Sequence, residues 1–193
     1  MSNTKLDKNN LAYIVGVALG DGGLSNPNGR AVRLRISCDT KYPVIIDNIT
    51  SAIKKLLPTN KVSEVNRRAY CVDISCYSNK WENLLGWKAK EGSKEKQKVS
   101  IPDWIKNNRI YSKHCLRGLF ETDGSVYNDR DYLMANFVTI IPTLADDVMK
   151  IISTLGFKPN IQKFKTSNGK IKHTIRISKN TEKFIKTVGI SKK

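Results

Sequence analysis

Two aspartates, Asp21 and Asp123, end similar stretches of the 193-residue sequence, and each is followed by glycine. The stretches read GVALGDG (16–22) and GLFETDG (118–124). Both are typical of a short helix that ends at a glycine. A carboxylate at that end faces the negative pole of the helix dipole, so positive charge is expected nearby. Two such carboxylates together with phosphate oxygens would suit Mg²⁺ and metal-assisted phosphodiester hydrolysis.

Small residues are spaced four apart in both predicted helices: Gly16 and Gly20 in the first, Gly118 and Thr122 in the second. Residues four apart share one helix face, and an interior glycine costs about 1 kcal/mol relative to alanine. We therefore predict that the helices cross at these faces and bring their terminal aspartates together. Gly20 and Thr122 adjoin the acids and are assigned to the same metal site. The alternative is that each aspartate is an ordinary capping or turn residue; their duplication favours the metal site.

The composition favours a polyanionic partner. Lysine and arginine number 34 against 17 acidic residues, a formal net charge of +17, which is typical of nucleic-acid binding. A solvated basic surface or a ribosome-associated protein is the alternative. The four cysteines and two histidines match no zinc-site spacing. No apolar run is long enough to span a membrane, and the polar first ten residues lack the apolar core of a signal peptide. We expect an intracellular protein, in the cytoplasm or nucleoid, or in an organelle.

The repeat extends beyond the two motifs. Each motif is followed by segments typical of a strand, a helix beginning with proline, a hairpin and a short helix ending in glycine. These segments are 31–37, 43–57, 61–75 and 79–87, and then 132–140, 142–156, 160–178 and 180–190. The sequence therefore predicts an α+β protein with pseudo-twofold symmetry: an N-terminal half at 1–87, a charged linker at 88–112 and a C-terminal half at 113–193.

Residues 14–22 and 116–124 resemble the two nine-residue signatures of the LAGLIDADG homing endonucleases, and the second copy is the closer match. The resemblance covers nearly the whole chain and is to the monomeric, two-motif, intron-encoded type. It implies an αββαββα unit in each half, with two saddle-shaped antiparallel sheets over double-stranded DNA. It also implies that the last acid of each motif binds Mg²⁺ or another divalent cation such as Mn²⁺. The implied reaction is cleavage of both strands across the minor groove, leaving short 3′ overhangs.

The resemblance also implies a lysine near the acids, which polarises the attacking water or the phosphate. Lys98, in the stretch KVSIP, is the candidate, although it lies one residue further from Pro102 than the pattern expects. The matching position in the second half is Lys192 or Lys193. The alternative for any one of so many lysines is a solvated surface charge.

Alternation along the strands predicts one apolar face and one basic face. Two-stranded ribbons fit the major groove, where arginine bound to guanine is the commonest specific contact. The candidates for base reading are Arg33, Arg35, Arg67, Arg68, Asn136, Lys163, Lys172 and Arg176, with Arg30, Asn128 and Arg130 at loop tips. The alternative is a polar face that simply meets water.

Two other functions fit the same scaffold: an RNA maturase that binds intron RNA, and a DNA-binding regulator. Regulators on this scaffold tend to lack the acids. Because Asp21 and Asp123 are both present, the sequence favours an endonuclease, while a maturase could retain them.

Overall fold

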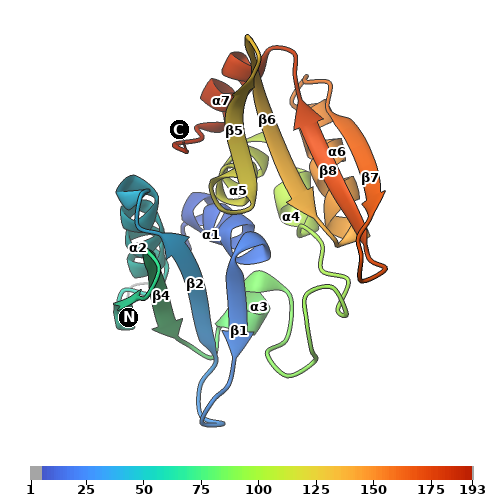
Figure 1. Ribbon diagram of the computed structural model, residues 1–193. Coiled ribbons are helices and arrows are strands. Elements are labelled where there is room, and N and C mark those ends of the chain that lie inside the picture. Colours follow the sequence, from blue (N-terminus) through green and yellow to red (C-terminus); the bar gives the residue numbers. More distant parts are fainter. Residues whose placement is uncertain (1–5, 193) are drawn as a thin grey trace.

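The computed structural model describes residues 6–192, and these form two similar halves, each with an antiparallel sheet beside helices (Figure 1). The first half comprises α1 (Lys8–Gly20), β1 (Gly22–Ser25), β2 (Arg33–Asp39), α2 (Pro43–Leu56), β3 (Val62–Arg67), β4 (Cys71–Tyr77) and α3 (Trp81–Leu85). The second comprises α5 (Arg109–Thr122), β5 (Gly124–Asp129), β6 (Tyr132–Thr139), α6 (Pro142–Thr154), β7 (Asn160–Lys165), β8 (Ile171–Ile177) and α7 (Thr181–Val188). The short helix α4 (Asp103–Lys106) lies between them. The predicted α+β fold with a repeated half is confirmed.

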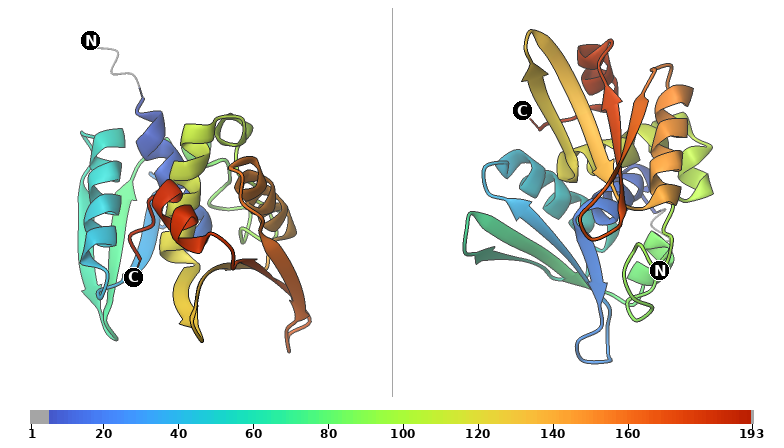
Figure 2. Two further views of the ribbon diagram at one scale, coloured as in Figure 1. Left: turned by 90° about the horizontal axis from the view of Figure 1, so that it is seen from above. Right: turned by 45° about the vertical axis from the view of Figure 1, so that its right-hand side comes forward.

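Both sheets have the same strand order, β1-β2-β4-β3 and β5-β6-β8-β7. In β2 the side chains of Leu34 and Ile36 are fully buried, whereas Arg35 between them is exposed. In β6, Ala135 and Phe137 are likewise fully buried. Each sheet therefore packs one face on helices and leaves the other open, and the strand hairpins of both sheets extend to the same side of the molecule (Figure 2, left).

Local capping sets where the two central helices begin. The Asp7 side chain accepts the backbone N–H groups of residues 9 and 10 at the start of α1, and Asn108 accepts those of residues 110 and 111 at the start of α5. Because Asn108 is the cap, α5 begins within the segment 88–112 that we predicted as linker. Ile105 of α4 is also fully buried, so the end of that segment belongs to the packed body. Within residues 6–192, no helix is both long and apolar enough to cross a bilayer.

Helices α1 and α5 cross with their backbones in close contact at the centre of the molecule (Figure 1). A Cβ atom built on Gly16 would lie 2.0 Å from the carbonyl oxygen of Cys115, and one on Gly118 would lie 2.4 Å from that of Tyr13. A Cβ on Gly20 would lie 2.1 Å from Oγ1 of Thr122. The helices therefore meet at the faces that carry the small residues, and glycine is required where backbone faces backbone.

Substituting Gly16→Ala should force the two central helices apart. The added methyl would overlap backbone, which cannot move out of its way as a flexible side chain can, and overpacking of this kind costs about 1–3 kcal/mol or more. The free energy of unfolding, measured by urea titration, should fall by that amount. Gly23→Ala is the control, because a Cβ there meets nothing within 4 Å. Equal unfolding midpoints for the two variants would contradict this account of the interface.

Candidate functional site

Asp21 and Asp123 lie side by side where the two central helices end. Each is the C-cap of its helix, α1 or α5, and each immediately precedes the first strand of its half. The helix crossing brings the ends together, since Oδ2 of Asp123 lies only 3.4 Å from the position a Cβ on Gly20 would take. Both aspartates keep an exposed surface. The structure therefore brings together two acids that are far apart in the sequence.

The surroundings of Asp123 disfavour its charged form. Burial among protein atoms, followed by the negative charge of Asp21, raises the pKa of Asp123 to about 6. The ammonium groups of Lys94 and Lys192 act in the opposite direction and lower it. A pair of neighbouring carboxylates with a raised pKa is an arrangement that a divalent cation would stabilise.

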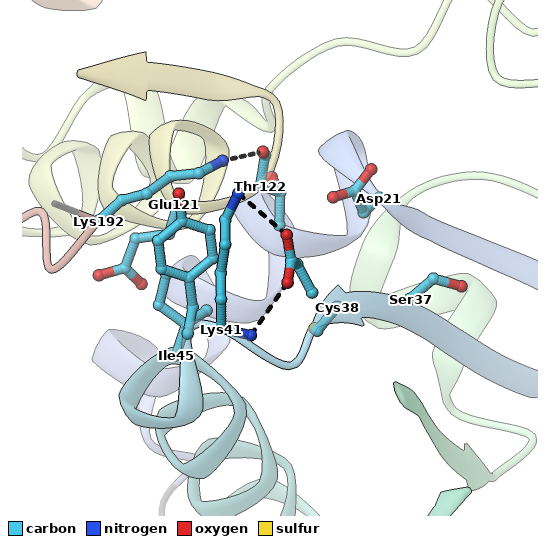
Figure 3. Close-up of a pocket in the computed structure, with 10 residues that line it drawn as sticks. Asp21, Ser37, Cys38, Lys41, Ile45, Glu121, Thr122 and Lys192 are labelled. Carbon is cyan, nitrogen blue, oxygen red and sulfur yellow. Dashed lines mark hydrogen bonds and ion pairs between the residues drawn. The ribbon is translucent and has the colours of Figure 1, made fainter. Parts of the chain in front are cut away.

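Two lysines supply positive charge at the ends of these helices. The Lys94 ammonium donates to the carbonyl oxygens of Ala18 at 3.1 Å, Leu19 at 2.7 Å and Gly20, which end α1. The Lys192 ammonium donates to the carbonyl oxygen of Thr122, the last residue of α5, at 2.7 Å (Figure 3). It also donates to that of Gly124, the first residue of β5, at 2.8 Å. The last carbonyls of a helix lack partners within that helix, so the two lysines satisfy them and offset the dipoles.

Burial lowers the pKa of both lysine ammonium groups, while the charges of Asp21 and Asp123 oppose that shift. The larger of these opposing effects comes from Asp123 at Lys94 and from Asp21 at Lys192. Each lysine thus binds the end of one helix and faces the acid of the other.

The structure does not bring Lys98, the lysine proposed from the sequence, to this site. Lys98 is exposed, and its backbone carbonyl accepts a hydrogen bond from Oγ1 of Thr143 in α6 at 3.2 Å. Lys94 takes the place instead. The repeat carries the missed signal, because a Ser-Lys pair follows the last helix of each half, at 93–94 and at 191–192. Lys193 lies outside the described residues.

Gly20 and Thr122, which we assigned to the metal site, have other partners in this structure. Their carbonyl oxygens accept from the two lysines, and Oγ1 of Thr122 donates to the carbonyl of Gly118 at 2.9 Å. Within residues 6–192, no cluster of three or more His, Cys, Asp or Glu side chains could hold a metal ion. Two carboxylates, with water and phosphate oxygens completing the shell, are nevertheless a donor set that suits Mg²⁺.

Two cavities flank the pair of acids, and each combines one aspartate with one lysine. The first, of about 190 Å³, is lined by Asp21 and Lys192, with Lys41 at its side (Figure 3). The second, of about 470 Å³, is lined by Asp123 and Lys94. The pseudo-twofold symmetry of the fold therefore produces two similar sites that share one pair of carboxylates.

The open face of the first sheet carries an ordered cluster of charges around Asp73. This residue is only 6% exposed and accepts hydrogen bonds from Oγ of Ser37 at 2.7 Å and from Nε of Arg67 at 2.8 Å. Nη1 of Arg35 lies 3.9 Å from the same carboxylate. Asp73 therefore forms ion pairs with two of the predicted DNA-binding arginines, Arg35 and Arg67.

Other predicted DNA-binding residues of the first half also lie on this side. Arg33 shares the open face of β2, and its Nε donates to Oγ of Ser25 at 3.2 Å. Arg30 and Arg68 are exposed in the turns that follow β1 and β3. The first half therefore presents arginines both on the sheet and at its hairpin tips.

In the second half, Asn136, Lys172 and Arg176 share the open face. Asn136 is opposite Arg176 in the sheet register, is 9% exposed and donates to the hydroxyl of Tyr127 at 2.8 Å. Arg130 is exposed in the turn between β5 and β6. Of the three predicted residues on the sheet, Asn136 is thus the least accessible.

The prediction that Lys163 lies on the open face is wrong. Lys163 is opposite the buried His173, on the helix-covered side of the sheet. Asn128, predicted at a loop tip, is an exposed residue within β5, next to its last residue and opposite Leu133. Gln162 and Phe164 occupy the open face of β7 instead. Because strand side chains alternate, a shift of one residue in the predicted register reverses the face.

Comparisons with known proteins agree with this architecture. The model of the LAGLIDADG-like domain matches residues 111–189, and that of the WhiA LAGLIDADG-like domain matches residues 10–78. No sequence among the curated proteins matches the chain.

Solved structures similar to this chain include those of the homing endonuclease I-DmoI and of DUF199/WhiA. One is I-DmoI in complex with DNA and Mn, with a TM-score of 0.70 and 18% identity over 94% of this chain and 96% of that one. Another is the N-terminal LAGLIDADG domain of DUF199/WhiA, with a TM-score of 0.66 and 14% identity over 95% and 84%. Full-length DUF199/WhiA from Thermatoga maritima has a TM-score of 0.67 and 14% identity over 98% and 58%. With a LAGLIDADG-like domain in each half, the chain belongs to the LAGLIDADG family.

Proposed function

We propose that this protein is a site-specific homing endonuclease that cleaves both strands of double-stranded DNA by divalent-metal-dependent hydrolysis. Cleavage is across the minor groove and leaves short 3′ overhangs. The observation that carries the proposal is the pair Asp21 and Asp123, which lies between two cavities that each contain a lysine. Similar structures support it, since I-DmoI is described in complex with DNA and Mn and with DNA and Ca.

The two carboxylates would hold Mg²⁺ or Mn²⁺. When bound, such a cation stabilises charge on phosphate oxygens and lowers the pKa of water. Lys94 and Lys192 keep positive charge fixed beside the acids, where they can stabilise the phosphate as negative charge develops. Because each cavity has its own aspartate and lysine, each would serve one DNA strand.

The open faces of the sheets would read the bases. Arg35 and Arg67 are held by Asp73, and arginine fixed in this way can pair with guanine in the major groove. Exposed basic side chains at the hairpin tips, such as Arg30 and Arg130, would contact phosphates and make binding salt-dependent. We expect the protein to act as a monomer inside the cell, encoded within an intron.

A second candidate function is DNA binding without cleavage, as in a regulator. The observation that favours it is the match of the first half to the WhiA LAGLIDADG-like domain. Incubating a DNA pool that carries randomised sites with the protein, in Mg²⁺ and then in EDTA, distinguishes the two. Selective binding without cutting in either condition would favour the regulator, and binding only to structured intron RNA would favour the maturase.

Asp21→Asn and Asp123→Asn should each abolish double-strand cleavage while leaving DNA binding intact. Each variant removes one of the two metal-binding carboxylates, and loss of even an outer-shell partner costs about 10- to 100-fold at metal sites. The cleavage rate of the selected target in Mg²⁺ should therefore fall by more than about 100-fold, with the binding affinity in Ca²⁺ unchanged. Cleavage at the parent rate by either variant would remove the metal-ligand role.

Divalent-cation binding should weaken as the pH falls through the raised pKa of Asp123, about 6. The protonated carboxyl must lose its proton before it can bind the metal, so the proton and the cation compete. Below that pKa, the Mn²⁺ affinity of the protein should fall by about tenfold for each pH unit. Calorimetric titration with Mn²⁺ at about pH 7.5 and about pH 5.5 measures this change. An affinity that stays constant over this range would contradict the assignment of Asp123.

Arg35→Ala should weaken binding to the selected target by about 1–3 kcal/mol and relax base preference at the position that Arg35 reads. Lys163→Ala is the matched control, because it removes one positive charge from the helix-covered side of a sheet. It should cause only a small weakening that is uniform across sequences. Binding to single-base target variants at fixed salt measures both effects, and identical profiles would show that the open face does not read bases.

A further inference from the structure

Glu121 is a buried carboxylate beside the site, and the chemistry above gives it no part. Glu121 is only 3% exposed. It occupies the sixth position of the second motif, and the same position of the first motif is the buried Leu19. A buried charge is tolerated only when it is well partnered. The hydroxyl of Tyr13 donates to its Oε2 at 2.7 Å, and Nε of Arg117 and the backbone N–H of Ser191 each donate to its Oε1 at 2.9 Å.

These contacts attach residues 189–192, which follow α7, to helix α5. Nη2 of Arg117 also donates to Oγ of Ser191 at 3.3 Å, so Ser191 is held through both its backbone and its side chain. The next residue, Lys192, donates to the carbonyl oxygens of Thr122 and Gly124 and lines the same cavity as Asp21 (Figure 3). The Glu121 carboxylate therefore holds Ser191, the residue that directly precedes Lys192 in the chain.

The other lysine is held in a different way. Lys94 lies next to Glu95, which forms an ion pair with Lys170 between β7 and β8. The motif residue equivalent to Glu121 is the apolar Leu19, which contributes only its backbone carbonyl to Lys94. The position equivalent to Glu121 thus carries no carboxylate that anchors the segment of Lys94, so removing the Glu121 carboxylate should affect only the cavity of Lys192.

We propose that Glu121 is a positioning residue: its carboxylate anchors Ser191 and thereby holds Lys192 at the cavity that contains Asp21. This inference rests on the proposed nuclease function. If each cavity serves one strand, the two strands of the target depend differently on Glu121. A change at Glu121 then converts an enzyme that cuts both strands into one that chiefly nicks.

The test uses supercoiled plasmid that carries the target selected with the parent protein, and it follows nicked and linear products separately. In Glu121→Gln, cutting of one strand should slow by about 10- to 100-fold, the usual cost of losing a group that orients another. The other strand should be cut at the parent rate, so nicked circles accumulate. Lys192→Met should slow the same strand, and the double variant should be no slower than Lys192→Met alone.

Tyr13→Phe is the control, because it removes only the hydrogen bond to Oε2 and leaves the Ser191 bond to Oε1 in place. It should cut both strands in the parent ratio. If Glu121→Gln slows both strands equally, or slows the strand that Lys192→Met leaves unaffected, Glu121 has only a structural role and the inference is wrong.

Hydrogen exchange tests the anchoring without relying on cleavage. The backbone amide of Ser191 should exchange at least about tenfold faster in Glu121→Gln than in the parent and in Tyr13→Phe, since its acceptor is weakened. Unchanged exchange would overturn the anchoring. If the parent cuts neither strand in Mg²⁺ or Mn²⁺, the nuclease function fails, and the exchange result then decides the anchoring alone.

Discussion

The close contact between α1 and α5 is the constraint on which the rest of the structure depends. The backbones approach so closely that a side chain on Gly16 or Gly118 would overlap the carbonyl oxygen of the other helix. This contact fixes the pseudo-twofold axis, because each sheet is connected to the end of one of these helices. It also sets the separation of the two aspartates, since each is the C-cap of its helix.

The same contact concentrates negative charge in one region of the molecule. Two helices end together, with their dipoles and their terminal carboxylates contributing negative charge to one region. Lys94 and Lys192 satisfy the free carbonyls and offset part of that charge. The pKa of Asp123 nevertheless remains raised. The region is therefore suited to a cation, and the surroundings that make it suitable also make it unfavourable when no cation is bound.

The two halves share a plan but differ in how they are held. In the first half, the charge cluster around Asp73 orders arginines on the open face of the sheet. Ser37 is opposite Asp73 in the first sheet, and the equivalent pair in the second sheet is Val138 and Thr174, whose side chains are neutral. The acid Glu121 has no counterpart in the first motif. Under the proposed function, such differences would let one chain bind two half-sites of unlike sequence, which a symmetric dimer of identical halves would not do.

The sequence alone determined the repeat, the α+β class and the pairing of Asp21 with Asp123. Periodicity, prolines, glycines and small-residue spacing act locally, and duplication makes each local signal appear twice. Tertiary structure decided the rest. Lys94 rather than Lys98 lies at the site, because the place of a loop lysine depends on its tertiary contacts. Lys163 lies on the helix-covered side, because strand register depends on the partner strand. Arg117 is a local partner of Glu121, four residues away on the same helix, but Tyr13 and Ser191 became its partners only when segments far apart in the chain met. No local pattern encodes which distant buried groups will find each other.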